Sequence, residues 1–212
     1  MRSFLLGAER EGAFNIPFKV EKARSLPYDA EVEYIFGDHV ACIELGVGMT
    51  QSSTLTIDAA FGTDALAGRL DTLFSSGGDG TIIRYRGANS VDSLFGTHKG
   101  WNVVSAIDAK ARHVFKVDDD GLYVDGNKSS WPKDDHRSYS SGNLVLFAWS
   151  RSSTERRSAA LVYGLKISDN GEDIIDLVPV RVGNVGYMYD KVSGNLLGNE
   201  GDGMIGIGPD KN

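Results

Sequence analysis

The sequence has one cysteine, five prolines and no long apolar run. The shortage of cysteine and the absence of long apolar runs each exclude a class of protein. The single Cys42 excludes an intrachain disulfide framework and a multi-cysteine zinc site, and it leaves the redox compartment open. No apolar run approaches the roughly 18 residues of a transmembrane helix, and Glu9 stops the run after Arg2 below the length of a signal-peptide core. We therefore expect no membrane insertion and no secretion signal.

Motifs for metal-dependent or nucleophilic catalysis are also missing. The four histidines are scattered singly, and there is no His-Glu-x-x-His, no paired cysteine spacing and no Gly-x-Ser-x-Gly. Residues 201–206 formally match Gly-x-Gly-x-x-Gly, but a dinucleotide site also needs a following helix and a later acidic residue, for which the chain has no room. The sequence thus predicts no catalytic residue, no bound metal and no cofactor.

Positive charge is in deficit, because the net charge is −7 and the pI is near 5.1. Such a chain has no general attraction to nucleic acid or to an anionic membrane surface. We expect neither as a partner.

Glycine and β-branched residues are abundant, and they predict an all-β fold. Twenty-six glycines, 212 residues and a hydrophobic fraction of 41% suit one domain of many short strands with a sizeable core. Period-2 alternation and short apolar runs indicate strands, and polar stretches at 87–100 and 127–142 indicate loops. The strands are expected within 26–35, 41–47, 53–61, 81–86, 101–107, 112–117, 122–124, 144–149 and the closing run 161–197.

Turn sequences support the same architecture. Asp169-Asn170-Gly171 and Asp125-Gly126 each separate apolar runs, which is a strong hairpin signal, and residues 192–195 form a further turn. The segment 63–74 has leucines at helical spacing, yet Gly68 disfavours a helix, so we expect a loop followed by a strand.

Residues 1–25 form an N-terminal arm ahead of a domain at 26–212. In the arm Phe14, Ile16, Phe18 and Val20 alternate with polar residues, and Pro17 restricts such a strand to a sheet edge. An apolar arm of this kind either folds back on its own sheet or pairs with a neighbouring subunit to make a homo-oligomer. The sequence leaves both open.

From residue 26 onward the chain resembles a family of laminin-G-like, concanavalin-A-like jelly rolls found in gut bacterial surface proteins and phage virion proteins. The resemblance covers most of the chain and is most specific in its last third; it rests on Leu26-Pro27 and on the runs at 32–35, 43–47, 112–126, 166–199 and 208–209. It implies a two-sheet antiparallel jelly-roll sandwich located on a virion or a bacterial cell surface, with other subunits as partners, but no known activity.

Two groups of carboxylates could carry chemistry. Glu31 and Glu33 lie two apart on one predicted strand, as do the acids of sandwich-fold glycan hydrolases, although strand acids mostly face solvent. The run 118–120 supplies three aspartates whose oxygens suit calcium, but a hairpin turn rich in turn-forming residues is the simpler account. A glycoside hydrolase or lyase is therefore the alternative to a non-enzymatic module.

Aromatic residues in the predicted loops are the candidate ligand-binding residues. Sugar recognition uses an exposed aromatic plane beside polar groups. A loop tryptophan can instead cover the edge of the sandwich, whereas Trp149 and Cys42 are expected in the core. The candidates are Trp101, Trp131, His136 and Tyr139. We expect a structural or adhesion protein that binds glycan or, failing a ligand, a purely architectural subunit.

Overall fold

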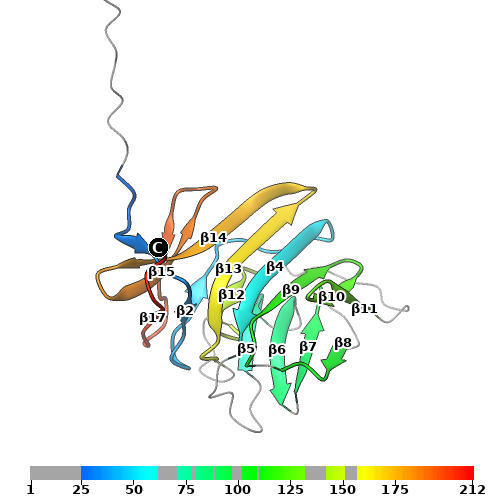
Figure 1. Ribbon diagram of the computed structural model, residues 1–212. Coiled ribbons are helices and arrows are strands. Elements are labelled where there is room, and N and C mark those ends of the chain that lie inside the picture. Colours follow the sequence, from blue (N-terminus) through cyan, green and yellow to red (C-terminus); the bar gives the residue numbers. More distant parts are fainter. Residues whose placement is uncertain are drawn as a thin grey trace, which may run out of the picture.

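The computed structural model describes residues 25–61, 71–77, 80–87, 89–96, 102–108, 110–131, 142–150 and 157–212 (Figure 1). Within these ranges there are seventeen strands and no helix. The strands are β1 (Ala30–Glu31), β2 (Ile35–Phe36), β3 (Ile43–Glu44), β4 (Ser53–Ala60), β5 (Asp71–Ser75), β6 (Ile82–Gly87), β7 (Ser90–Leu94), β8 (Asn102–Ser105), β9 (His113–Asp118), β10 (Gly121–Val124), β11 (Asn127–Ser130), β12 (Val145–Leu146), β13 (Leu161–Asp169), β14 (Glu172–Val182), β15 (Val185–Asp190), β16 (Leu196–Leu197) and β17 (Gly206–Ile207).

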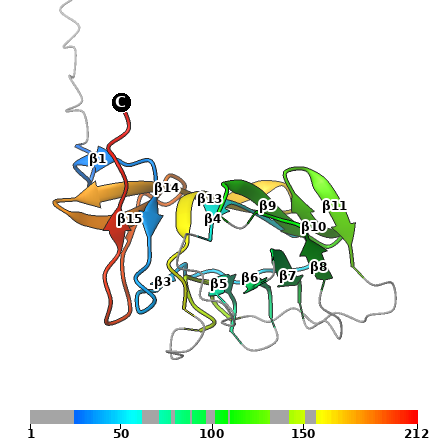
Figure 2. The ribbon, with the colours of Figure 1, turned by 60° about the horizontal axis from the view of Figure 1, so that its bottom comes forward.

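The strands form two antiparallel sheets that lie face to face, as Figure 2 shows. The larger sheet has the order β11-β10-β9-β4-β13-β14-β15-β16, with β1 paired to β14, β2 to β13 and β17 to β2. The smaller sheet has the order β3-β12-β5-β6-β7-β8. The predicted all-β sandwich of two antiparallel sheets is confirmed.

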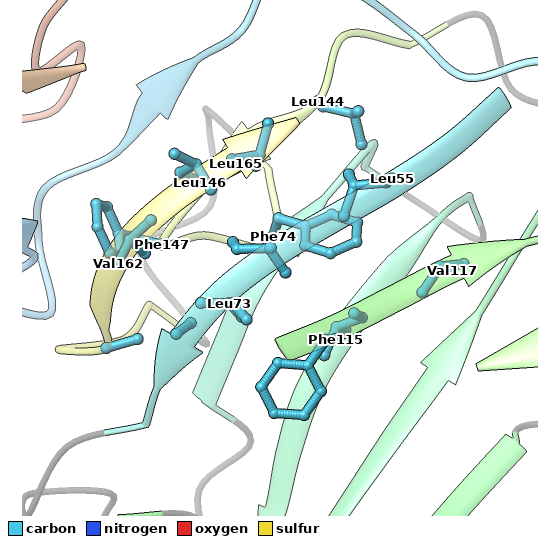
Figure 3. Close-up of a cluster of buried hydrophobic side chains, with 14 of the residues drawn as sticks. Leu55, Leu73, Phe74, Phe115, Val117, Leu144, Leu146, Phe147, Val162 and Leu165 are labelled. Carbon is cyan, nitrogen blue, oxygen red and sulfur yellow. The ribbon is translucent and has the colours of Figure 1, made fainter. Parts of the chain in front are cut away.

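The core lies between the two sheets and follows from the alternation of apolar residues. In β4 every second side chain is buried, and Leu55 and Ile57 lie opposite Val117 and Phe115 of β9. The smaller sheet contributes Phe74 and the β12 residue Leu146, which point into the same cluster (Figure 3). Each fully buried side chain of this size contributes about 1.5–3 kcal/mol, so this layer supplies much of the stability.

The predicted hairpin turns have the expected backbone conformation. Asn170 and Gly171 between β13 and β14 have φ values of 50° and 84°, and Asp125 and Gly126 between β10 and β11 have 51° and 81°. Two successive residues with positive φ make a type I′ turn, whose twist matches that of the flanking strands. Local chemistry therefore sets both hairpin registers.

The predicted polar loop 87–100 is wrong over β7, which is a central strand of the smaller sheet. Its polar residues are buried with partners instead of exposed. The Arg84 guanidinium on β6 binds the Asp92 carboxylate through two hydrogen bonds of 2.6 and 2.9 Å, and the Ser93 hydroxyl donates to the Ile82 carbonyl. Because a cross-strand partner offsets the burial of the charge, a sequence that looks like a loop forms a core strand.

Strand β11 is a second correction, because it occupies the start of the predicted loop 127–142. It is the polar edge of the larger sheet, and its exposed residues include Lys128. Polar, charged edge strands are a common protection against unwanted pairing, and they carry no apolar alternation. The strand expected over 144–149 is shorter than predicted, since Phe147 with a φ of 64° follows β12 directly.

The glycine-rich tail packs under aromatic rings. A Cβ atom on Gly206 would lie 2.2 Å from the Phe36 ring, and one on Gly208 would lie 2.9 Å from the Tyr34 ring. Gly206 belongs to the pairing of β17 with β2, and Gly208 follows it. The other two glycines of the formal dinucleotide motif are also in close contacts, because a Cβ on Gly201 would lie 2.7 Å from the Val40 carbonyl and one on Gly203 would lie within 2.5 Å of Asp38. The spacing of the motif is thus a packing pattern. Residues 1–24, which hold most of the predicted arm, and residues 62–70 lie outside the described ranges.

Gly121→Ala is expected to destabilise the fold, because its Cβ would lie 2.5 Å from the Ser129 backbone oxygen of β11. Overpacking against backbone costs about 1–3 kcal/mol, and urea unfolding should show this loss. The matched control is Gly164→Ala, whose Cβ would meet its nearest atom at 3.5 Å. Equal stability of the two variants would contradict the argument.

Candidate functional site

A groove of two adjoining parts lies where the β3–β12 end of the smaller sheet meets strands β14, β15 and β16, at one end of the larger sheet. The first part has a volume of about 570 Å³ and is lined by Glu44, Ser76, Gly77, Asn143, Val145, Ser150 and Glu200. The second has a volume of about 430 Å³ and is lined by Glu44, Leu45, Gly46, Val47, Ile174, Ile175, Asp190, Ser193, Asn195, Leu197 and Glu200. Glu44 and Glu200 line both parts and so lie where the parts join.

Strand alternation places the groove residues. In the β3–β12 pair Val145 lies opposite Glu44, and Leu146 lies opposite Ile43. Leu146 and Ile43 face the main core, so Glu44 and Val145 face the other side. There Val145, Cys42 and Ala148 make a second, small apolar cluster. The buried position of Cys42 agrees with its predicted role as a small core residue.

Hydrogen bonds hold the wall that Glu200 contributes. The Asn199 side-chain oxygen accepts from the Cys42 backbone N–H at 3.0 Å, and its amide group donates to the Gly201 and Gly203 carbonyls. The Glu200 N–H also donates to the Cys42 carbonyl at 2.8 Å. Asn199 thus fixes a segment late in the chain against β3.

Polar side chains of the first part carry both donors and acceptors. The Asn143 amide donates to a Glu44 carboxylate oxygen at 2.6 Å. Ser76 is almost fully buried, and its hydroxyl has no hydrogen-bond partner among the described residues. Amide, hydroxyl and carboxylate groups around an open space suit a ligand rich in hydroxyl groups.

Asp190 organises the second part. Its carboxylate accepts from the backbone N–H groups of Asp176, Val192 and Ser193 at 3.0–3.2 Å, and from the Ser193 hydroxyl at 2.6 Å. Burial alone would raise the pKa of Asp190, but these donors together hold the pKa below its ordinary value of 3.8. The carboxylate is therefore charged at neutral pH, and it fixes the turn that carries Ser193 and Asn195.

Of the predicted ligand-binding residues, only Trp131 lies within the described ranges. Its ring is 5% exposed and stacks on Phe95 at a centroid distance of 6.4 Å, and its indole N–H donates to the Asp118 carbonyl at 2.8 Å. Trp131 therefore covers the end of the core in this structure and does not line the groove. Its role in ligand binding stays a prediction.

The other three candidates, Trp101, His136 and Tyr139, lie outside the described residues. None of the described residues that line the groove is aromatic. The stacking surface expected from the sequence is thus not among the groove residues that the structure places.

The carboxylates singled out in the sequence lie away from the groove. Glu31 on β1 approaches Lys211 at 3.5 Å, near the C-terminus. Asp118 opens the β9–β10 turn, where it accepts from the Asp120 and Gly121 N–H groups and binds Lys116 at 2.7 Å. The hairpin turn expected at 118–121 is confirmed. No three or more His, Cys, Asp or Glu side chains gather to hold a metal ion in the described ranges.

Sequence reasoning missed the groove because its residues come from distant positions. Glu44, Asn143 and Glu200 meet only when β3 pairs with β12 and Asn199 bonds Cys42. The one sequence signal is a charged residue, Glu44, inside an apolar strand.

No protein-family model matches the chain, and no curated protein shows significant similarity to it. The described ranges also contain no membrane-spanning helix.

Asp190→Asn should lower the stability of the fold in a pH-dependent way. The folded-state pKa of Asp190 lies below 3.8, so the ionised group stabilises the fold above about pH 4, and this contribution disappears as the pH falls through the folded-state pKa. We expect a loss of about 1–3 kcal/mol at pH 7, measured by urea unfolding, and a smaller difference from the native chain near pH 3. Exposed Asp202→Asn is the control, and a pH-independent loss in Asp190→Asn would contradict the assignment.

Proposed function

We propose that the chain is a non-enzymatic adhesion and structural protein that binds a glycan in the groove. The observation that carries the proposal is the set of amide, hydroxyl and carboxylate groups around a two-part groove on a β-sandwich. Ligand sites of comparable volume use a few converging polar groups to fix the orientation of the ligand. Sugar hydroxyls can both donate to Glu44 and accept from Asn143.

The setting that we propose is a phage virion or, alternatively, a bacterial cell surface. This part rests on the resemblance of residues 26–27, 32–35, 112–126 and 166–199 to jelly rolls of such proteins. Other subunits of the same particle or surface are the expected protein partners. Mass spectrometry of purified particles tests the virion setting, and absence of the chain from particles would remove it.

Asn143→Ala should weaken glycan binding, because it removes a donor in the first part of the groove and leaves a Glu44 oxygen without that hydrogen bond. A loss of about 1–3 kcal/mol corresponds to an increase in Kd of roughly 5-fold to 150-fold for the best ligand of a glycan array. The control is Asn127→Ala, which changes an exposed asparagine on β11, outside the groove.

The glycan array, together with a panel of polysaccharides incubated with the native chain, separates the alternatives. A blank array would favour a purely architectural subunit. Release of reducing sugar from a polysaccharide by the native chain would replace the proposal with a glycoside hydrolase or lyase. An equal loss of affinity in both asparagine variants would place the ligand elsewhere.

A further inference from the structure

The β14–β15 hairpin has an apolar surface on the side that faces away from the core. The register places Val178, Val180 and Val182 opposite Tyr189, Tyr187 and Val185, so these six side chains share one face, which we name the hairpin face. The opposite face of the hairpin carries Leu177 and Met188, which belong to the core. Apolar side chains thus lie on both faces of the hairpin, although the core-side face also carries Arg181 and Asp190.

An antiparallel hairpin with one face towards solvent ordinarily carries polar residues on that face. Here Val180 in the middle of the hairpin face is buried, whereas Val182 and Val185 at its tip are 38% and 46% exposed. Exposed apolar side chains that lie together are a candidate contact surface for another chain segment. The tip of the hairpin face is such a surface.

Residues 25–29, which we name the N-terminal connector, contact the hairpin. The Tyr28 ring packs on the Tyr189 ring at a centroid distance of 5.0 Å, and the Asp29 carboxylate accepts from the Gly183 N–H in the hairpin turn at 2.7 Å. Leu26, one residue before Pro27, is 57% exposed. The connector therefore contacts the hairpin at Tyr28 and Asp29, and it carries a further exposed apolar side chain, Leu26.

The direction of the connector indicates whether the chain's own arm or the arm of a second copy of the chain lies on the rest of the hairpin face. The β1–β14 register pairs Ala30 with Arg181 and Glu31 with Val180, so residues before Asp29 have passed the last residue of β14. They cannot extend this ladder. In Figures 1 and 2 the connector, at the blue end of the ribbon, leads away from both sheets.

We propose that the tip of the hairpin face binds the N-terminal arm of a second copy of the chain. The arm offers an apolar stripe of Phe14, Ile16, Phe18 and Val20, which matches the valine and tyrosine side chains of the hairpin face. Each copy presents both the arm and the face, so exchange between copies closes a symmetric oligomer. This inference names the receiving surface for the arm, and it does not depend on glycan binding in the groove.

Light scattering coupled to size-exclusion chromatography tests the proposal. The full chain should have a molar mass of at least twice 22.9 kDa. A chain that begins at Ser25 should be a monomer with an unchanged circular dichroism spectrum. Val185→Glu in the full chain should also give a monomer. The matched control is Val114→Glu on β9, 42% exposed and away from the hairpin, which should retain the native mass.

A cysteine pair identifies the copy that supplies the arm. In a chain with Phe18→Cys and Val185→Cys, oxidation should give disulfide-linked oligomers on a non-reducing gel, while the native Cys42 stays buried. A monomeric full chain with an intramolecular disulfide would overturn the proposal in favour of the chain's own arm. An oligomer that persists without residues 1–24 would overturn it in favour of direct packing between two hairpin faces.

Discussion

The structure depends on one long strand, β14, whose two halves pair with different strands. Its first half pairs with β13 and completes the larger sheet of the sandwich, and its second half pairs with β15 beyond the sandwich. The type I′ turn at Asn170 and Gly171 fixes the first pairing. One wall of the groove, the hairpin face and the attachment of β1 all follow from the second. A register change in β14 would move a wall of the candidate site and the face that we propose binds the arm.

Features that local chemistry specifies could be predicted from the sequence. The Asn170-Gly171 and Asp125-Gly126 turns and the alternation around Leu55 and Ile57 indicated the hairpins and the core without knowledge of distant partners. Strand β7 could not be recognised, because its Asp92 is tolerated in the interior only through Arg84 on the neighbouring strand. The groove was also beyond prediction, since three chain segments must meet before it exists.

The same distinction separates the two surfaces. The groove is a product of tertiary structure, and its polar residues belong to loops and strand ends held by Asn199 and Asp190. The hairpin face is a product of secondary structure alone, because the register of β14 and β15 determines which side chains share it. Loss of Asn199 or Asp190 contacts would therefore alter the groove while leaving the hairpin face assembled. The ligand binding and the self-association that we propose would then respond to different substitutions.

The pairing of β2 with β17 has a consequence for the order of events during synthesis. Strands β1 and β2 find their partners only in β13, β14 and β17, which the ribosome makes much later than β1 and β2. The rings of Tyr34 and Phe36 stay without their glycine partners until Gly206 and Gly208 have emerged. Strand β2 is consequently fully paired only after residue 207 has been made, because one of its two partners is β17. We therefore expect the proposed exchange of the arm to follow the docking of β2 and not to precede it.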